Sequence, residues 1–291
     1  MKILITGGSG LLGQYLNIRL SVDSEIITIY KSNPGNCKDY NSLQLDINEY
    51  DKFEELFKSY SPDLVVHTAA VSNPLLTDKI SSAQIYRTNV TATQNLARLC
   101  KLYGAKIIYI STDLVYAGYR GSMLKEDAKI IPVSIYAETK LMGEVKIREA
   151  TDDYLILRTA LLYGFGLNGR ENHFHKMYNK LKAGEKVNLF SDQYRTPISL
   201  IEAARIIGEL CGKNIKGEII NFGGPERISR LELGYKLCEQ SGFDKKLIQS
   251  VSMDALPDYP QVADVSMDTG KLRSLGITQK SIDESLNEII N

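Results

Sequence analysis

The feature that most constrains the fold of this chain is a glycine-rich segment near its N-terminus, ITGGSGLLGQYL. It places Gly7, Gly10 and Gly13 directly after an apolar strand-like run (residues 2–6) and at the start of a helix-like stretch. In such a turn the first glycine permits a tight bend, the second lets a phosphate approach the backbone, and the third lets helix and strand pack closely. Because the free amides at a helix start hold phosphates, the segment predicts a dinucleotide site. Its ligand residues would be Gly7, Gly10, Leu11, Leu12 and Gly13.

Strand-like and helix-like segments alternate through the first half of the chain. The strand-like runs are residues 2–6, 26–30, 64–68, 106–111 and 154–158. The later helix-like stretches are residues 50–60, 81–102 and 135–150. Each crossover between parallel strands needs a helix, and continuously apolar strands are covered on both faces. The pattern therefore predicts an α/β fold, a Rossmann-type doubly wound parallel sheet.

The rhythm changes after Gly164, where a loop-like segment is followed by a helix at 174–183, a second helix and one more strand. We expect residues 1–163 to form the dinucleotide-binding Rossmann domain, with 196–223 returning to it. Residues 164–195 and 224–291 would form a smaller C-terminal substrate-binding lobe. The lobe would cover the carboxyl ends of the strands, where open α/β sheets bind ligands.

Composition argues against several classes of partner and site. Lys plus Arg and Asp plus Glu both number 35, so neither nucleic acid nor an anionic membrane is an expected partner. The apolar runs are short and the N-terminus lacks a signal-peptide pattern, so we expect a cytoplasmic protein. The four cysteines form no CxxC pair, and His173 and His175 have no third ligand near them in the sequence, so no metal site is expected.

The end of the second strand bears on the choice of cofactor. NAD-binding folds usually place a carboxylate there for the ribose 2′-hydroxyl, whereas this chain has Tyr30 and Lys31 followed by a serine. The cation of Lys31 would attract a 2′-phosphate, so we favour NADP(H) over NAD(H). The alternative is that Lys31 is an ordinary solvated loop lysine.

The segment SIYAETKLMGE places Tyr136 and Lys140 four residues apart on a predicted helix, and therefore on one face. A phenol has a reference pKa near 10, and a neighbouring ammonium favours the phenolate. We therefore expect Lys140 to lower the pKa of Tyr136 and to fit it for proton transfer. The alternative is a surface pair of little energetic weight.

These motifs together carry a resemblance to a known family. GxxGxxG, LDI (45–47), HTAA (67–70), STD (111–113) and YAETK (136–140) resemble the extended short-chain dehydrogenase/reductases. STDLVYAG, LRTALLYG and DQYRTPISLIEAA are similar to segments of dTDP-4-dehydrorhamnose reductases and related nucleotide-sugar 4-ketoreductases. The resemblance extends, in the family's order, along essentially the whole chain.

The resemblance implies roles for individual residues. Thr112 stands at the family's catalytic Ser/Thr position and would stabilise charge on a carbonyl oxygen. Tyr136 would donate the proton, Lys140 would also bond the nicotinamide ribose, and Asp113 would orient the substrate or Thr112. Other implied contacts are Asp46 and Ile47 to adenine, Ala69 and Ala70 beside the cofactor, and Asn89 near the active site. Asp46 could equally cap a helix, the alanines could be packing residues, and Asn89 could be structural.

The chain also departs from the family pattern. Leu161 stands where the reductases typically have a tryptophan that lines the sugar pocket, and Gln261-Val262 stands where they often have Arg-Pro. Arg195 and Arg227 are alternative cations for a nucleotide diphosphate. We expect Asp113, Leu161 and Arg195 to contact the substrate.

The function expected from this resemblance is NADPH-dependent reduction of the 4-keto group of a nucleotide-activated 6-deoxy sugar, in a homodimer. One alternative is a nucleotide-sugar epimerase with bound NAD. Another is a non-catalytic NADP-binding regulatory subunit, similar to that of methionine adenosyltransferase. No sequence pattern identifies the nucleotide base or the sugar of the substrate.

Overall fold

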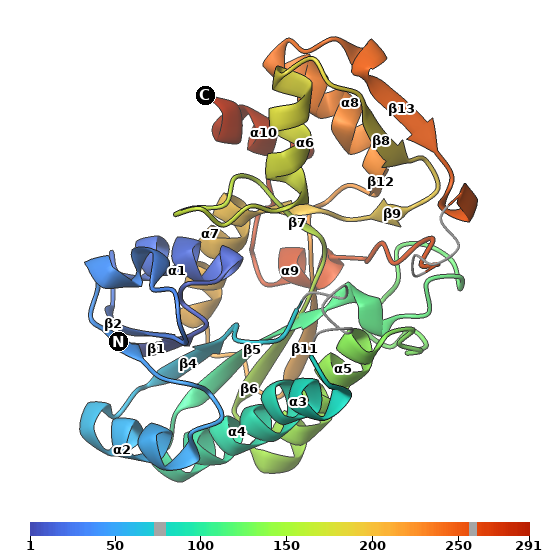
Figure 1. Ribbon diagram of the computed structural model, residues 1–291. Coiled ribbons are helices and arrows are strands. Elements are labelled where there is room, and N and C mark those ends of the chain that lie inside the picture. The colour runs from blue at the N-terminus through green and yellow to red at the C-terminus, as the bar shows by residue number, and fades with distance from the viewer. Residues whose placement is uncertain (73–79, 256–260) are drawn as a thin grey trace.

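The computed structural model describes residues 1–72, 80–255 and 261–291 and is built on a seven-stranded sheet (Figure 1). The strand order is β11-β6-β5-β4-β1-β2-β3, and every pairing is parallel. The strands are β1 (Lys2–Thr6), β2 (Glu25–Tyr30), β3 (Ser42–Gln44), β4 (Leu64–His67), β5 (Lys106–Thr112), β6 (Tyr154–Thr159) and β11 (Glu218–Phe222). This order confirms the predicted doubly wound α/β fold, with the strand order reversing between β1 and β4.

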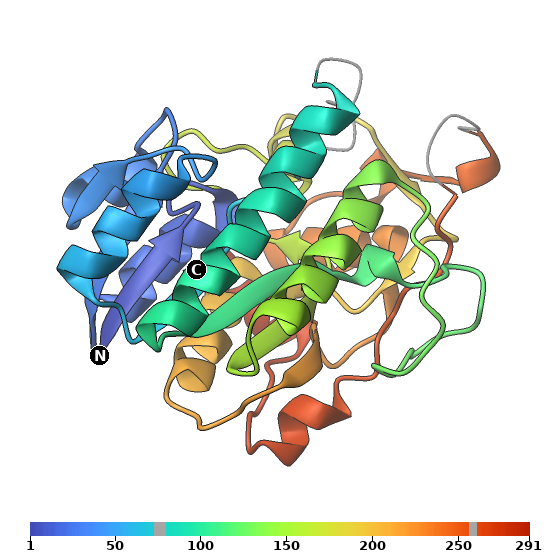
Figure 2. The same cartoon turned by 90° about the horizontal axis from the view of Figure 1, so that it is seen from below.

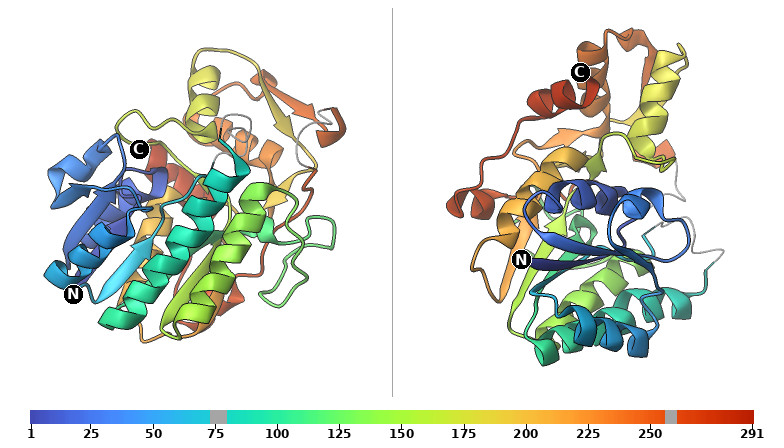
Figure 3. Two further views of the ribbon diagram at one scale, coloured as in Figure 1. Left: turned by 60° about the horizontal axis from the view of Figure 1, so that its bottom comes forward. Right: turned by 90° about the vertical axis from the view of Figure 1, so that its left-hand side faces the viewer.

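Helices cover both faces of the sheet. The described helices are α1 (Leu11–Leu20), α2 (Tyr50–Tyr60), α3 (Ser82–Tyr86), α4 (Ala92–Tyr103), α5 (Ile135–Ala150), α6 (His173–Lys182), α7 (Leu200–Cys211), α8 (Arg230–Ser241), α9 (Gly270–Ser274) and α10 (Ile282–Ile290). Of these, α6, α8 and α10 pack with one another in a separate core. Helices α1 and α7 pack on one face, and α2, α4 and α5 pack on the other, where α4 and α5 lie side by side (Figures 2 and 3). None of the described helices is long and apolar enough to cross a membrane.

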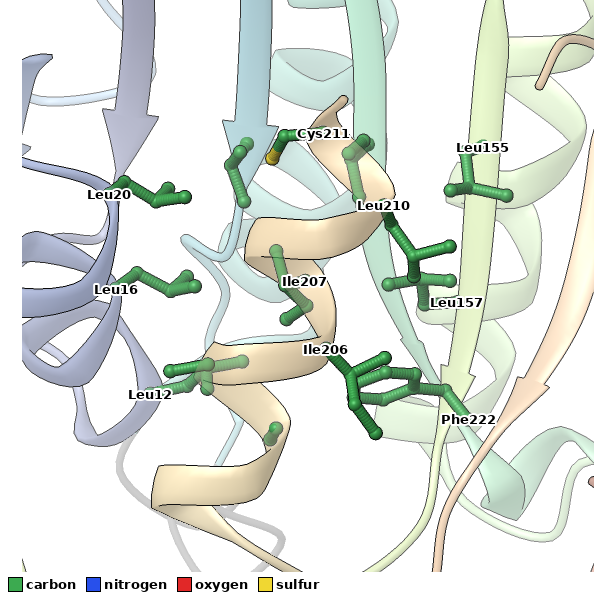
Figure 4. Packing of buried hydrophobic residues seen from close by; sticks show 14 of the residues in the cluster. Leu12, Leu16, Leu20, Leu155, Leu157, Ile206, Ile207, Leu210, Cys211 and Phe222 are labelled. Atoms are coloured by element: carbon green, nitrogen blue, oxygen red, sulfur yellow. The ribbon is translucent and has the colours of Figure 1, made fainter. Parts of the chain in front are cut away.

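The core beneath α1 and α7 fixes where the glycine turn lies. Leu12, Leu16 and Leu20, spaced four residues apart, form the buried stripe of α1 and meet Ile207 of α7 (Figure 4). Burying each such side chain contributes about 1.5–3 kcal/mol. The stripe therefore anchors α1 along its length and holds its first turn at the carboxyl edge of the sheet.

Smaller strand pairs build a lobe above this edge (Figure 3). They are β7 (Leu162–Tyr163) with β10 (Ile198–Ser199), β9 (Tyr194–Arg195) with β12 (Ile228–Ser229), and β8 (Val187–Phe190) with β13 (Ile248–Val251). The lobe has its own core, in which Phe174 of α6, Leu237 of α8 and Leu286 of α10 meet. Leu272 and Ile277, from the segment expected in the lobe, pack instead in the core beneath α1 and α7. The predicted domain division remains a prediction.

Several predicted elements match the structure closely. The helix predicted at 135–150 is α5, and Ser134 caps it by accepting a hydrogen bond from the Ala137 amide. The single helix predicted at 81–102 is divided, because a π-helical turn, η3 (Arg87–Thr91), separates α3 from α4. Such turns often occur at functional sites.

Candidate active site

The glycine turn has the geometry that a phosphate-binding loop requires. Gly7 has a φ of +72°, and a Cβ there would lie 2.7 Å from the Ala69 amide nitrogen. A Cβ on Gly13 would lie 2.2 Å from the Gly7 carbonyl oxygen, so the helix can approach the strand only with glycine there. Gly10 precedes α1, whose first turn contains Leu11 and Leu12 and has neither a side-chain cap nor an acidic residue. These residues fit a dinucleotide diphosphate.

The sequence prediction missed Gly8. A Cβ at this position would lie 1.7 Å from the Thr28 hydroxyl oxygen and 3.1 Å from the Cys37 sulfur, so a larger residue must displace the turn. The signal was present in the sequence as the doublet Gly7-Gly8. The sequence does not show that Thr28 of β2 lies beside Gly8, which is why the need for glycine was missed.

Lys31 and Asp46, for which the sequence suggested separate contacts to the cofactor, pair with each other. The Lys31 ammonium lies 2.8 Å from a carboxylate oxygen of Asp46. Burial alone would raise the pKa of Asp46, but Lys31 and hydrogen bonds from Asn48 lower it below its ordinary value. Lys31 remains mostly exposed, whereas Tyr30 at the strand end is half-buried and Ile47 packs partly against the α2 core. The pair therefore lies at the edge of the predicted adenosine site.

Thr112 and Asp113 stand at the carboxyl end of β5, where a short 3₁₀ turn, η4 (Asp113–Val115), begins. The Thr112 hydroxyl donates a hydrogen bond to Asp113 over 3.2 Å and accepts one from the Leu114 amide. Asp113 is 4% exposed, and burial raises its pKa despite the opposing charge of Arg195. One of its carboxylate oxygens is buried without a hydrogen bond. A buried carboxylate with spare acceptor capacity can receive a ligand hydroxyl.

Tyr136 lies in the first turn of α5 and faces Thr112 and Asp113. Burial, and then the charge of Asp113, raise the pKa of its phenol to about 12, while an interaction with the Thr112 hydroxyl opposes the rise. The expectation that Lys140 lowers this pKa is therefore wrong for this structure, because burial outweighs the other influences. A phenol with this pKa is protonated at neutral pH, which is the form that can donate a proton.

Lys140 is 2% exposed and lies on the ring of a second tyrosine. Its ammonium nitrogen is 3.9 Å from the centroid of the Tyr109 ring, at cation–π distance. Burial lowers the pKa of Lys140 to about 7, and the charge of Glu144, one turn further along α5, opposes the drop. Gly143 makes this arrangement possible, because a Cβ there would lie 2.3 Å from the Tyr109 hydroxyl.

His67 at the end of β4 begins the HTAA motif, but the sequence analysis assigned no role to it. The Thr93 hydroxyl donates to the Asn89 carbonyl oxygen, so it must accept from His67 Nε2, 2.9 Å away. His67 Nδ1 is then the acceptor for the Thr6 hydroxyl at 2.7 Å. Burial, and then the charge of Lys140, lower the pKa of His67 to about 3, so its ring is neutral.

Asn89 joins the same network and is structural in its contacts. Its side-chain oxygen accepts from the Val71 amide over 2.8 Å, and its side-chain nitrogen donates to the Val71 carbonyl and to the Thr139 hydroxyl. Thr139 lies between Tyr136 and Lys140 on α5. Asn89 therefore ties the loop after β4, which contains Ala69 and Ala70, to the helix of the candidate catalytic pair.

Two of the lobe's arginines, Arg195 and Arg227, are paired with carboxylates. Arg195 is 5% exposed and its Nε lies 3.5 Å from Asp113, while its outer nitrogens donate to the carbonyls of Tyr194 and Val262. Arg227 stacks on the Tyr194 ring and forms an ion pair with Asp264 at 2.7 Å. A depression of about 300 Å³ adjoins Arg227 and is lined by Gly118, Tyr119, Gly121, Ser122, Ala263 and Asp264. Leu161, expected to touch the substrate, is partly buried next to β7.

A buried polar network fixes α5 on the sheet. Arg158 of β6 and Glu144 of α5, both 2% exposed, form an ion pair at 2.9 Å, and Ser111 donates to the same carboxylate at 2.5 Å. Arg158 also donates to the Tyr116 hydroxyl, which in turn donates to Asn221 of β11. Burial alone would lower the pKa of Arg158, but Glu144 more than offsets this and raises it. These contacts join segments far apart in the chain, so no local sequence pattern predicted them.

The part of the chain that the structure describes contains no candidate metal site. No group of three or more His, Cys, Asp or Glu side chains there could hold a metal ion. All four cysteines are buried and unbridged.

Comparisons with known proteins agree with this geometry. The family described as RmlD substrate binding domain matches residues 1–291. The probable low-salt glycan biosynthesis reductase Agl14 of Haloferax volcanii is 28% identical over 98% of this chain and 96% of that protein. Methionine adenosyltransferase 2 subunit beta of Rattus norvegicus is 26% identical over 96% of this chain and 84% of that protein. The dTDP-4-dehydrorhamnose reductase of Bacillus anthracis, solved in complex with NADP, shares the fold with a TM-score of 0.84 at 24% identity, over 99% of this chain and 98% of that chain.

Proposed function

Because the chain belongs to the RmlD substrate-binding-domain family, we propose that it reduces the 4-keto group of a nucleotide-activated 6-deoxy sugar with NADPH. The observation that carries the proposal is the meeting of Thr112, Asp113 and Tyr136 at the carboxyl edge of the sheet, beside the glycine turn. Open α/β sheets bind ligands at this edge. The similar reductases named above support the same class of substrate.

Tyr136 is the proposed proton donor. A bound nicotinamide would supply the hydride that reduces the ketone carbon, and the ketone oxygen would then need a proton. Tyr136 is protonated at neutral pH, and burial and the Asp113 charge raise its pKa further above that range. The developing alkoxide is the stronger base and accepts that proton.

Thr112 and Lys140 would stabilise the charges that appear during this step. Thr112, whose hydroxyl interacts with Tyr136, would donate a hydrogen bond to the ketone oxygen as its negative charge grows. Lys140 would stabilise the phenolate that Tyr136 becomes. Its ammonium lies on the Tyr109 ring, and among the described residues it forms no ion pair with a carboxylate that would neutralise its charge.

The proposed cofactor contacts follow the edge of the sheet from the glycine turn. The amides of Leu11 and Leu12 would hold the diphosphate, and Ala69 and Ala70 would pass close to the nicotinamide half. Lys31 would meet the 2′-phosphate of NADPH by leaving Asp46, an exchange that costs little because exposed pairs contribute about 0–1 kcal/mol. This favours NADPH over NADH. NADH would bind in a different way: Lys31 would stay paired with Asp46, and Asp46 would accept a hydrogen bond from the ribose hydroxyl.

One relative favours a second candidate function. Methionine adenosyltransferase 2 subunit beta is 26% identical to this chain, so a non-catalytic NADP-binding subunit that associates with a synthetase is the competing proposal. The meeting of Thr112, Asp113 and Tyr136, with the buried Lys140 one helical turn further along α5, speaks for the reductase, because a purely structural subunit does not need this set of side chains.

A substrate panel tests the proposal. The loss of NADPH absorbance is followed with catalytic amounts of the protein and a set of nucleotide 4-keto-6-deoxy sugars, with NADH in parallel. We expect turnover on at least one sugar and a higher kcat/KM with NADPH. Tight NADPH binding without turnover on any sugar, together with a stable complex with a methionine adenosyltransferase, would instead establish the regulatory role.

A further inference from the structure

The segment that enters the lobe after β7 reaches back to the glycine turn. Residues 165–170, here called the clasp, lie over α1 (Figure 1). The Tyr15 hydroxyl donates to the Phe165 carbonyl over 2.7 Å, and the Gln14 side chain donates to the Leu167 carbonyl over 3.1 Å. Asn168 of the clasp donates back to Gln14 over 2.8 Å. Three hydrogen bonds thus hold the clasp against the first turns of α1.

Gln14 is the centre of this arrangement. It is fully buried, and besides its two clasp contacts its amide nitrogen lies 3.4 Å from the Ser9 carbonyl and its oxygen accepts from the Asn36 amide at 3.1 Å. An amide side chain offers two donors and two acceptor sites, and all four are used. One side chain therefore fixes the glycine turn, the loop after β2 and the clasp relative to one another.

Arg170 ends the clasp and touches the glycine turn itself. Its Nε donates to the Ser9 carbonyl over 3.0 Å. The clasp folds back so sharply that a Cβ on Gly166 would lie 1.4 Å from the Arg170 carbonyl oxygen. Within the described residues, no hydrogen bond or ion pair engages the two outer nitrogens of the Arg170 guanidinium. The cationic end of Arg170 is thus held beside the turn by one of its three nitrogens.

Two other cations of the N-terminal part of the chain have carboxylate partners. Lys31 pairs with Asp46, and Arg19 of α1 pairs with Asp23 at 2.9 Å. The glycine turn and the first turn of α1 carry no charged side chain. The amide groups of a helix start supply only about half a positive charge, whereas a diphosphate carries two negative charges. A guanidinium, with its parallel N–H groups, is suited to supply the rest.

We propose that Arg170 is a cofactor-binding residue that grips the dinucleotide diphosphate from the lobe side, opposite the amides of α1. The assignment rests on the proposed function, since it requires a dinucleotide on the glycine turn. It also means that the lobe contributes to cofactor binding.

Cofactor affinity in the full chain tests the assignment. Dissociation constants are measured by titration calorimetry for NADPH and for adenosine 2′-monophosphate, which lacks the diphosphate. Arg170→Gln should weaken NADPH binding about tenfold, the scale of one charged hydrogen bond, and leave adenosine 2′-monophosphate binding unchanged. Arg170→Lys should fall between. Arg148→Gln, which removes an exposed arginine from the last turn of α5, is the control and should bind both ligands as wild type does.

Two results would overturn the assignment. One is wild-type NADPH affinity in Arg170→Gln. The other is an equal loss of affinity for both ligands, since that would mean a distorted turn rather than a lost diphosphate contact. A wild-type chain that binds neither NADPH nor NADH is a separate outcome, which refutes the proposed function and this assignment with it.

Discussion

Replacing Glu144 by alanine leaves the Arg158 guanidinium buried without its counter-charge. In the folded protein Arg158 donates to both carboxylate oxygens of Glu144, at 2.9–3.3 Å, and each residue is only 2% exposed. Breaking such a pair from one side costs about 3–5 kcal/mol, because the remaining charge cannot regain water. At roughly 2–4 °C per kcal/mol for a chain of this size, the midpoint of thermal unfolding should fall by about 6–20 °C.

Calorimetry and urea unfolding measure this loss, with two control variants. Glu149→Ala removes an exposed partner of Lys146 on the same helix and should cost less than about 1 kcal/mol. Replacing Glu144 and Arg158 together by methionine should cost less than Glu144→Ala, because no unpaired charge remains. If Glu144→Ala unfolds within about 2 °C of wild type, or the double variant is the less stable, the pair does not anchor α5 as we infer.

Two further predictions concern the site itself. Lys140 has a pKa of about 7, so it loses its proton as the pH rises through that value and no longer stabilises the Tyr136 phenolate. The kcat/KM for ketone reduction should therefore fall about tenfold per pH unit above about pH 7. Initial rates that stay level to pH 9 would contradict this role. Gly8→Ala should destabilise the chain by about 1–3 kcal/mol and weaken NADPH binding, because the added Cβ would overlap the Thr28 hydroxyl. Adding Thr28→Ala to this variant should restore part of the lost stability. Gly212→Ala, where the added Cβ meets no close atom, should leave the stability measured by chemical denaturation unchanged.

The sequence predicted those parts of the fold that local pattern determines. Helix α5 was placed correctly, and the Ser134 cap at its start is a local signal of the kind that a sequence expresses. The π-helical turn at residues 87–91 was missed because apolar periodicity does not record a single inserted residue. Helices α8 and α10 were not identified, although capping boxes at Ser229 and Ser281 mark their starts.

The sequence predicted those parts of the site that lie within one short segment, and it missed contacts between segments that are far apart in the chain. The glycine turn and the Tyr136–Lys140 spacing are local. Lys31 and Asp46 are 15 positions apart, and only the pairing of β2 with β3 brings them together. The sign of the Tyr136 pKa shift was predicted wrongly, because burial is a property of the folded chain and outweighs any neighbour that the sequence can show.

The central claim is that Tyr136 delivers the proton in a reduction that depends on NADPH. The most direct measurement compares Tyr136→Phe with wild type for both NADPH affinity and turnover of the best sugar from the panel. Tyr103→Phe is the control, because Tyr103 ends α4 just before β5 begins and so lies at the amino edge of the sheet, away from the site. We expect wild-type NADPH affinity and a kcat lowered roughly 10²–10⁴-fold in Tyr136→Phe, with Tyr103→Phe unaffected. Turnover by Tyr136→Phe at the wild-type rate would contradict the account.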